Sequence, residues 1–117
     1  MHLFIFDYYD TLTSLEDPLA FIQALRQRHP GSKIILHTGA DPSMVDREHP
    51  GLRGLLDDYW LKPCLLPEML SEVSYSMMTL VDNDARQRRA MSRTLRDLPA
   101  GTWRVLDEGG LLGLLTE

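Results

Sequence analysis

Four short apolar runs of this sequence each end at residues that could do chemistry. The polar residues that follow these runs are, in chain order, Asp7 with Asp10 and Thr11, then Thr38, then Lys62, and finally Asp82, Asn83 and Asp84. A magnesium ion prefers oxygen ligands and takes one or two carboxylates beside substrate oxygens and waters. A lysine beside such an ion would offset the charge of a phosphate while Asp7 attacked phosphorus as a covalent nucleophile. The residue types therefore predict a site for Mg²⁺ and a phosphorylated substrate.

These residues can meet only if the apolar runs are neighbouring parallel strands. Apolar runs alternate with helix-like segments, which is the pattern of parallel strands joined by crossover helices. Strands are expected at 3–6, 34–36, 59–61, 77–81 and 103–106, and helices at 18–29, from 42, around 52–56, at 67–73 and at 85–95. We therefore expect a three-layer α/β/α sandwich around a Rossmann-like parallel sheet of about five strands. Its ligand site should lie beyond the carboxyl ends of the strands.

The length and composition fit one ordinary globular domain over residues 1–117. Hydrophobic residues make up 44% of the chain and charged residues 25%, and the longest apolar run is far shorter than a membrane span. No Lys or Arg precedes the first apolar run, so we expect neither a signal peptide nor a membrane partner. The single cysteine, Cys64, cannot form an internal disulfide, which favours a reducing, cytoplasmic location.

The order and spacing of the polar residues resemble the four motifs of the haloacid dehalogenase (HAD) superfamily. The first motif, Asp-x-Asp-Gly-Thr-Leu after an apolar strand, stands here as Asp7-Tyr8-Tyr9-Asp10-Thr11-Leu12. The other three, a Ser or Thr ending the second strand, a lysine often followed by proline, and an acidic pair after an apolar strand, match Thr38, Lys62-Pro63 and Asp82-Asn83-Asp84. The resemblance covers nearly the whole chain and implies the HAD-like fold.

The resemblance also implies a role for each matched residue in a Mg²⁺-dependent hydrolase. Asp7 would be the nucleophile and a metal ligand, and the backbone carbonyl of Tyr9 would be another ligand. Asp82 or Asn83 would complete the metal site, since the family uses both Gly-Asp and Asp-Asp forms of this motif. The expected phosphate-binding residues are Thr11, Thr38, Gly39 and Lys62. Asp84 is expected to cap the helix that follows it.

Tyr9 stands where the phosphatases of this family carry their general acid/base aspartate. An unperturbed tyrosine has a pKa of about 10, which is poorly matched to a base at neutral pH. The leading hypothesis is a phosphomonoester phosphatase that forms an aspartyl-phosphate and is slowed by Tyr9. A catalytically silent scaffold that binds a phosphorylated ligand or a protein is the first alternative, also favoured by Asp10 at the usual glycine position. A dehalogenase is the second, because 2-haloacid dehalogenases carry Asp-x-Tyr and a halide leaves without a proton.

The spacing of the motifs leaves no room for a cap domain. Only 22 residues separate Thr11 from Ile34, and 23 separate Thr38 from Lys62. Capped relatives use that module to exclude water and select small substrates. An open site suits a large, macromolecular substrate or closure by a second copy of the chain, and it argues against a small haloacid.

The positive charge of the chain is concentrated near its C-terminal end. Residues 85–104 hold six arginines and one acid, a net charge of +5, so the remaining residues sum to −10 in a chain of net charge −5. Four of these arginines recur at helical spacing and would share one helix face: Arg86, Arg89, Arg93 and Arg96. Such a face is either simply solvated or follows a nucleic-acid backbone.

Overall fold

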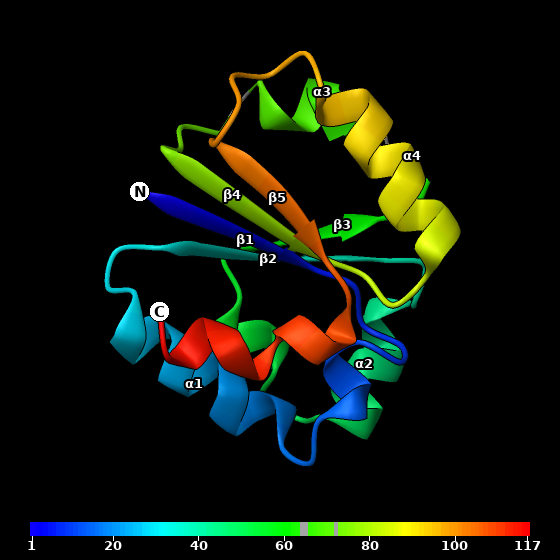
Figure 1. Cartoon of the computed structure of the whole chain (residues 1–117). Helices are drawn as coiled ribbons and strands as arrows, with labels where there is room; N and C mark the ends of the chain where they lie inside the picture. The colour runs from blue at the N-terminus through cyan, green and yellow to red at the C-terminus, as the bar shows by residue number, and fades with distance from the viewer. Residues whose placement is uncertain (64–65, 72) are drawn as a thin grey trace.

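Five strands and four α-helices alternate along the chain in a computed structural model that describes residues 1–63, 66–71 and 73–117 (Figure 1). The strands are β1 (His2–Phe6), β2 (Lys33–Thr38), β3 (Asp58–Leu61), β4 (Met77–Val81) and β5 (Trp103–Leu106). The α-helices are α1 (Pro18–Arg28), α2 (Pro42–Glu48), α3 (Leu66–Leu70) and α4 (Ala85–Leu95). Short 3₁₀ helices are η1 (Leu12–Ser14), η2 (Arg53–Leu55), η3 (Glu108–Gly110) and η4 (Leu112–Leu115).

Aspartate side chains start the longer helices. Asp17 accepts a hydrogen bond from the backbone N–H of Ala20 at 3.1 Å, and Pro18 occupies the first turn of α1, where its missing N–H costs nothing. Asp84 accepts from the backbone N–H of Arg86 at 2.8 Å and so begins α4. The expectation that Asp84 caps this helix is confirmed.

The strands form one parallel sheet in the order β3-β2-β1-β4-β5. β1 lies at the centre, where Ile5 pairs with Ile35 of β2 on one side and with Leu80 of β4 on the other. The chain adds β2 and β3 on one side of β1 and then crosses to add β4 and β5 on the other. Ligands in open parallel sheets bind at such a reversal, outside the carboxyl ends of the strands. Here that point is the gap between the ends of β1 and β4.

Alternating side chains of β1 divide the core into two layers. Phe4 and Phe6 are fully buried in the layer formed with α1, α2 and η4, while Leu3 and Ile5 are buried in the layer formed with α3 and α4. Figure 1 shows α1 and the C-terminal 3₁₀ helices on one face of the sheet and α3 and α4 on the other. Because side chains of a strand alternate between faces, a strand apolar on both faces needs helices on both. The expected α/β/α sandwich is confirmed.

Two segments differ from the sequence expectation. The third helix is shorter than the expected 67–73 and ends at Leu70. The segment after β5, where no element was expected, forms η3 and η4 and buries Leu111 and Leu114 against the layer around α1. A 3₁₀ helix has too few residues for a periodic apolar stripe, so only its contacts identify it.

The edge of the sheet that carries the polar residues is open. Residues 7–32 hold only η1 and α1 between strands, and residues 39–57 hold only α2 and η2, so neither described segment contains a cap domain. Within the described residues, no helix combines the length and apolar character needed to cross a membrane.

The C-terminal 3₁₀ helix should contribute measurably to stability through Leu114, whose side chain is only 1% exposed. Replacing Leu114 with Ala would leave a cavity beneath α1 and lower the free energy of unfolding by about 3 kcal/mol. Urea unfolding followed by circular dichroism measures this change.

The matched control is Leu112→Ala in the same 3₁₀ helix, because Leu112 is 62% exposed and its truncation should cost less than about 0.5 kcal/mol. Equal losses for the two variants would contradict the packing described for η4.

Candidate functional site

Two carboxylates meet at the point between β1 and β4 where the strand order reverses, and one ammonium lies between them. Asp7 follows β1 and Asp82 follows β4, the two strands that flank the reversal. Lys62, which follows β3, places its Nζ 3.1 Å from Asp7 Oδ1 and 3.0 Å from Asp82 Oδ2. The Asp82 side chain is 2% exposed, Asp7 11% and Lys62 22%. A single lysine therefore bridges two largely buried acids at the carboxyl edge of the sheet and offsets part of their charge.

The surroundings shift the protonation of this cluster. Burial and the nearby charge of Asp82 raise the pKa of Asp7, against the opposing effect of Lys62 and of the Thr11 hydrogen bond. Burial disfavours the charged form of Lys62, but the two carboxylates outweigh it and raise the pKa of the ammonium. Lys62 is therefore charged at neutral pH, and Asp7 is a more basic carboxylate than an exposed aspartate.

Thr11 connects the loop after β1 to the loop after β4. Its side chain is fully buried, and its hydroxyl donates to Asp7 Oδ2 at 3.2 Å. The Thr11 hydroxyl oxygen also accepts from the backbone N–H of Asn83 at 3.0 Å. The backbone N–H of Asp7 donates to the carbonyl of Val81 at 2.9 Å, which continues the β1–β4 pairing into the site. These bonds fix the Asp7 carboxylate in one orientation.

The amide of Asn83 lies where three oxygen atoms converge. Its hydrogen-bonding partners orient the amide so that the nitrogen donates to Asp7 Oδ2 at 3.1 Å, to the Tyr9 carbonyl at 3.1 Å and to Thr11 Oγ1 at 3.2 Å. The sequence left Asp82 and Asn83 as alternative metal ligands, and the structure places them differently. Asp82 is paired with Lys62, whereas Asn83 shares its surroundings with Asp7 Oδ2 and the Tyr9 carbonyl.

A left-handed residue turns the loop that carries Tyr9. Asp10 has φ of 57°, and its N–H donates to Thr13 Oγ1 at 2.9 Å. Aspartate tolerates this backbone region better than most residues other than glycine. The turn brings Thr11 back to Asp7, so aspartate at the usual glycine position is compatible with the loop.

Tyr9 contributes its backbone to the site and directs its side chain away from it. The ring is 40% exposed, and the hydroxyl donates to Glu48 Oε1 of α2 at 3.1 Å. Partial desolvation and the bond to Glu48 raise the pKa of Tyr9, so the phenol is protonated at neutral pH. Sequence reasoning did not foresee this partner. Among the described residues, the hydrogen bonds to the Asp7 carboxylate come from the side chains of Thr11, Lys62 and Asn83.

Tyr8 holds the same loop from inside the core. Its side chain is fully buried, and its hydroxyl shares a 2.7 Å hydrogen bond with His49 Nδ1. Desolvation and the nearby charge of Glu48 raise the pKa of Tyr8 to about 12. The pairing of His49 with Tyr8 could not be predicted from the sequence, because the two residues lie 41 positions apart.

Thr38 and Gly39 lie at the end of β2, beside the cluster. Thr38 is 1% exposed, and its hydroxyl accepts from the backbone N–H of Ala40 at 3.1 Å. Its carbonyl accepts from the backbone N–H of Lys62 at 2.9 Å, which joins the ends of β2 and β3. Among the described residues, no hydrogen bond joins the Thr38 side chain to Asp7, and Gly39 is exposed. Cys64, the single cysteine of the sequence, lies outside the described residues.

Arg88 is a site neighbour that helical spacing did not single out. Its Nη1 donates to the backbone carbonyl of Asp82 at 2.8 Å, from one turn into α4. The signal available in the sequence was its position four residues after the cap Asp84, where a side chain can reach back to the chain that enters the helix.

The donor atoms suit a hard cation, although carboxylates are few. Among the described residues, no three His, Cys, Asp or Glu side chains form a group that could hold a metal ion. The oxygen atoms gathered around the Asn83 amide belong to a carboxylate, a backbone carbonyl and a hydroxyl, and Mg²⁺ prefers oxygen ligands. Comparisons with protein-family models, curated proteins and solved structures found no match to this chain. The site must therefore be interpreted from its own geometry.

His37 provides a pH-dependent test of the buried site. It is 6% exposed in β2, and burial, with the nearby charge of Lys62, lowers its pKa to about 4. A histidine whose pKa is lowered on folding stabilises the protein above its unfolded pKa of about 6.5, and this stability is lost as the pH falls toward 4. In the variant His37→Gln, the loss of unfolding free energy between pH 7 and pH 4.5 should be smaller than in wild type by on the order of 2 kcal/mol.

Urea unfolding at the two pH values measures this difference, and an NMR titration of the His37 ring measures its pKa directly. A ring that titrates near 6.5 in the folded protein would contradict the buried environment described for β2.

Proposed function

We propose that this chain is an HAD-type phosphomonoester hydrolase in which Asp7 is the nucleophile. The observation that carries the proposal is the Asp7 carboxylate itself. Lys62 and Thr11 hold it at the point where the strand order of the parallel sheet reverses. A structural aspartate would be expected to cap a helix or pair on the surface. Asp7 instead is nearly buried, has a raised pKa and lies at an uncovered edge of the sheet.

Lys62 would supply the positive charge that a phosphate dianion needs. Its ammonium already contacts Asp7 and Asp82, so it would lie close to any phosphate that approached the Asp7 oxygens. The backbone N–H groups after β2, near Gly39, and the Thr38 hydroxyl would complete the binding of the phosphate oxygens. Preorganised donors of this kind stabilise charge that develops in the transition state.

Magnesium is the proposed cofactor, and the residues present fit it. Asp7 Oδ2, the Tyr9 carbonyl and the Asn83 amide oxygen, after rotation of that amide, would hold the ion. Bound there, Mg²⁺ would offset the negative charge of the phosphate. Asp82 would stay with Lys62 and keep the ammonium in place.

The reaction divides into two displacements at phosphorus. An Asp7 oxygen forms a bond to phosphorus while the ester P–O bond breaks, and the alcohol leaves with the bonding electrons and takes a proton from water. Water then attacks the aspartyl-phosphate, which returns the Asp7 carboxylate and releases inorganic phosphate. The Tyr9 side chain faces Glu48 rather than the leaving group, so turnover should be slow for alcohols that leave poorly.

Removing the nucleophile tests the proposal. Asp7→Asn keeps the shape of the side chain but cannot attack phosphorus, so metal-dependent hydrolysis of an aryl phosphate should fall at least a thousandfold. Aryl phosphates suit the assay because their leaving group needs little protonation. Release of the phenol is followed by absorbance, with and without Mg²⁺.

The matched control is Asp97→Asn, an exposed aspartate after α4, which should retain wild-type turnover. Equal and negligible turnover by wild type and Asp7→Asn on a broad phosphate panel would refute the phosphatase proposal.

A second candidate is a scaffold that binds a phosphorylated ligand without hydrolysing it. Two observations on Tyr9 favour it. Tyr9 occupies the position two residues after Asp7 in place of an aspartate, and its hydroxyl bonds Glu48 of α2. In this case Lys62 and the Mg²⁺ site would bind phosphate, and Asp7 would be a ligand only.

Restoring a carboxylate distinguishes the two candidates. Tyr9→Asp should raise the rate on alkyl phosphates by about 10²-fold or more if the site otherwise operates as a phosphatase, since a positioned acid/base contributes about 10²–10⁴-fold. Phosphate release from a simple alkyl phosphate is the measurement.

Tyr9→Phe is the control, because it removes only the hydroxyl that bonds Glu48 and should leave the rate unchanged. Wild-type and Tyr9→Asp proteins that bind phosphate but never release it from an ester would favour the scaffold.

A further inference from the structure

One face of α4 carries uncompensated positive charge. Arg86, Arg89, Arg93 and Arg96 are exposed, and Arg88 is partly buried beside them. Within the described part of the chain, none of these five residues forms an ion pair, whereas Arg26, Arg53 and Arg104 each pair with a carboxylate. We call the five residues of α4 the arginine surface. Its charge stands against a net −10 over the residues outside 85–104.

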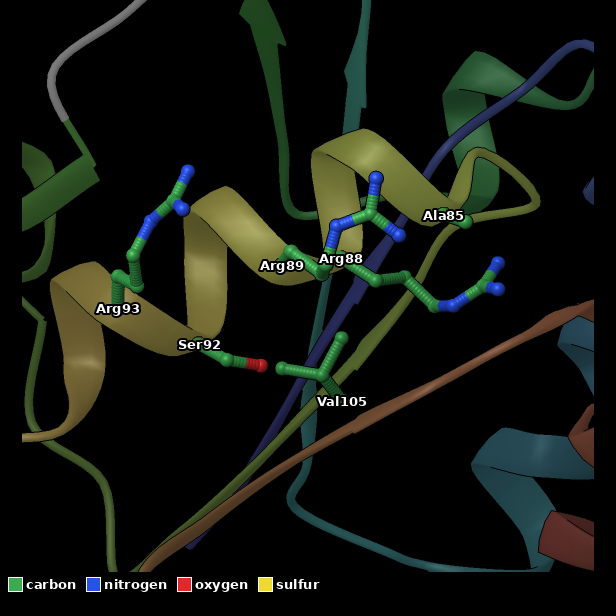
Figure 2. A pocket seen from close by; sticks show the side chains of 6 residues that line it. All are labelled: Ala85, Arg88, Arg89, Ser92, Arg93 and Val105. Carbon is green, nitrogen blue, oxygen red and sulfur yellow. The ribbon is translucent and has the colours of Figure 1, made fainter.

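The arginine surface borders a hollow between α4 and the sheet edge. A cavity of about 380 Å³ is lined by Ala85, Arg88, Arg89, Ser92, Arg93 and Val105. Figure 2 shows the arginine side chains leaving successive turns of α4, with the Ser92 hydroxyl directed toward Val105 of β5. Among the described residues, the side chains of Arg89, Ser92 and Arg93 have no hydrogen-bond acceptor, whereas Arg88 donates to the Asp82 carbonyl. The free donors suit a ligand rich in phosphate oxygens.

The arginine surface is continuous with the Asp7 site. Asp84, which caps α4, directly follows Asn83, and Arg88 donates to the Asp82 carbonyl at 2.8 Å. From Arg86 to Arg96 the helix rises about 15 Å, at 1.5 Å per residue. An extended polyanion whose end lay at Asp7 could therefore run along α4 past several guanidinium groups.

We propose that the arginine surface binds the sugar-phosphate backbone of a nucleic-acid strand and brings its terminal phosphate to Asp7. This inference rests on the proposed phosphatase function and names its substrate class. The open edge of the sheet admits a long substrate, since no cap domain lies within residues 7–32 or 39–57. The residues outside 85–104 carry a net charge of −10, which favours approach of a polyanion along α4.

An acidic protein is the competing occupant, and the surface fits it less well. Protein interfaces are centred on buried aromatic or aliphatic side chains, with charge at their rim. The exposed residues of α4 other than arginine are small or polar: Ala85, Gln87, Ala90 and Thr94. The charged groups repeat along one line, as phosphates do along a strand, and arginine binds phosphate through two parallel hydrogen bonds.

Binding can be measured without any catalysis. A fluorescein-labelled dT12 strand that lacks a terminal phosphate is titrated with the full chain, and anisotropy is followed from 25 to 200 mM salt. Arg89→Gln with Arg93→Gln should weaken binding at least tenfold at low salt. It should also make the slope of log K against log salt shallower by about 1.4, because each single-strand phosphate contact contributes about 0.7.

The matched control replaces an exposed basic residue at the end of α1 and another at the start of β2, Arg28→Gln with Lys33→Gln, and removes the same charge. The proposal predicts wild-type binding for this control. Absence of salt-dependent binding, equal weakening by both double variants, or binding of polyglutamate of matched charge as tightly as dT12 would overturn it.

A kinetic comparison separates this inference from the proposed function. Arg89→Gln with Arg93→Gln should raise KM at least tenfold for dT12 carrying a 5′- or 3′-terminal phosphate, and should leave aryl phosphate kinetics unchanged. Hydrolysis of aryl phosphate without release of either terminal phosphate would overturn the substrate assignment while the phosphatase stands. If wild type releases no phosphate from any ester, the phosphatase fails, and the dT12 binding result alone decides whether the arginine surface holds a strand.

Discussion

The ion-paired cluster of Asp7, Lys62 and Asp82 is the constraint on which the arrangement of the site depends. Two carboxylates follow the adjacent strands β1 and β4, where the strand order reverses. Because they are largely buried, their mutual repulsion would be strong if no cation lay between them. The cation comes from β3, which lies two strands from β1. The hydrogen bond from the Lys62 N–H to the Thr38 carbonyl carries the chain over the end of β2, so the lysine can reach both acids. The strand order and the charge balance therefore support each other.

The loop after β1 separates the backbone of Tyr9 from its side chain. The left-handed Asp10 returns the chain so that Thr11 bonds Asp7, and the Tyr9 carbonyl faces Asn83. The phenol points outward to Glu48, which belongs to α2. The loop thus keeps the oxygen atoms suited to a cation and gives up the acid/base side chain. In the proposed phosphatase, this site would bind phosphate and attack it through Asp7, and it would lack a group that protonates a poor leaving alcohol.

The division of charge along the chain becomes a division in space. The acids and Lys62 are brought to the carboxyl edge of the sheet, while the unpaired arginines line α4 as it leaves that edge. The bond from Arg88 to the Asp82 carbonyl ties the two regions together. A concentrated positive face on an acidic protein orients an anionic ligand as well as attracting it, because only one approach is favourable. On the proposal made above, the open site and the basic helix would both favour a long, multiply charged ligand.

The sequence by itself determined the strands, the longer helices and the edge at which the polar residues gather. Alternating apolar runs and the Asp-Pro and Asp caps suffice for this, because they are local signals: β4, β5 and α4 begin and end where the pattern predicts. Spacing along the chain could not show that Asp82 pairs with Lys62 while Asn83 faces the Tyr9 carbonyl, since neighbouring residues diverge only once packed. Nor could it show that Tyr9 turns toward Glu48, 39 positions away, or that Leu111 and Leu114 near the C-terminal end form part of the core. Such choices depend on contacts between distant segments, and only the tertiary structure brings those segments together.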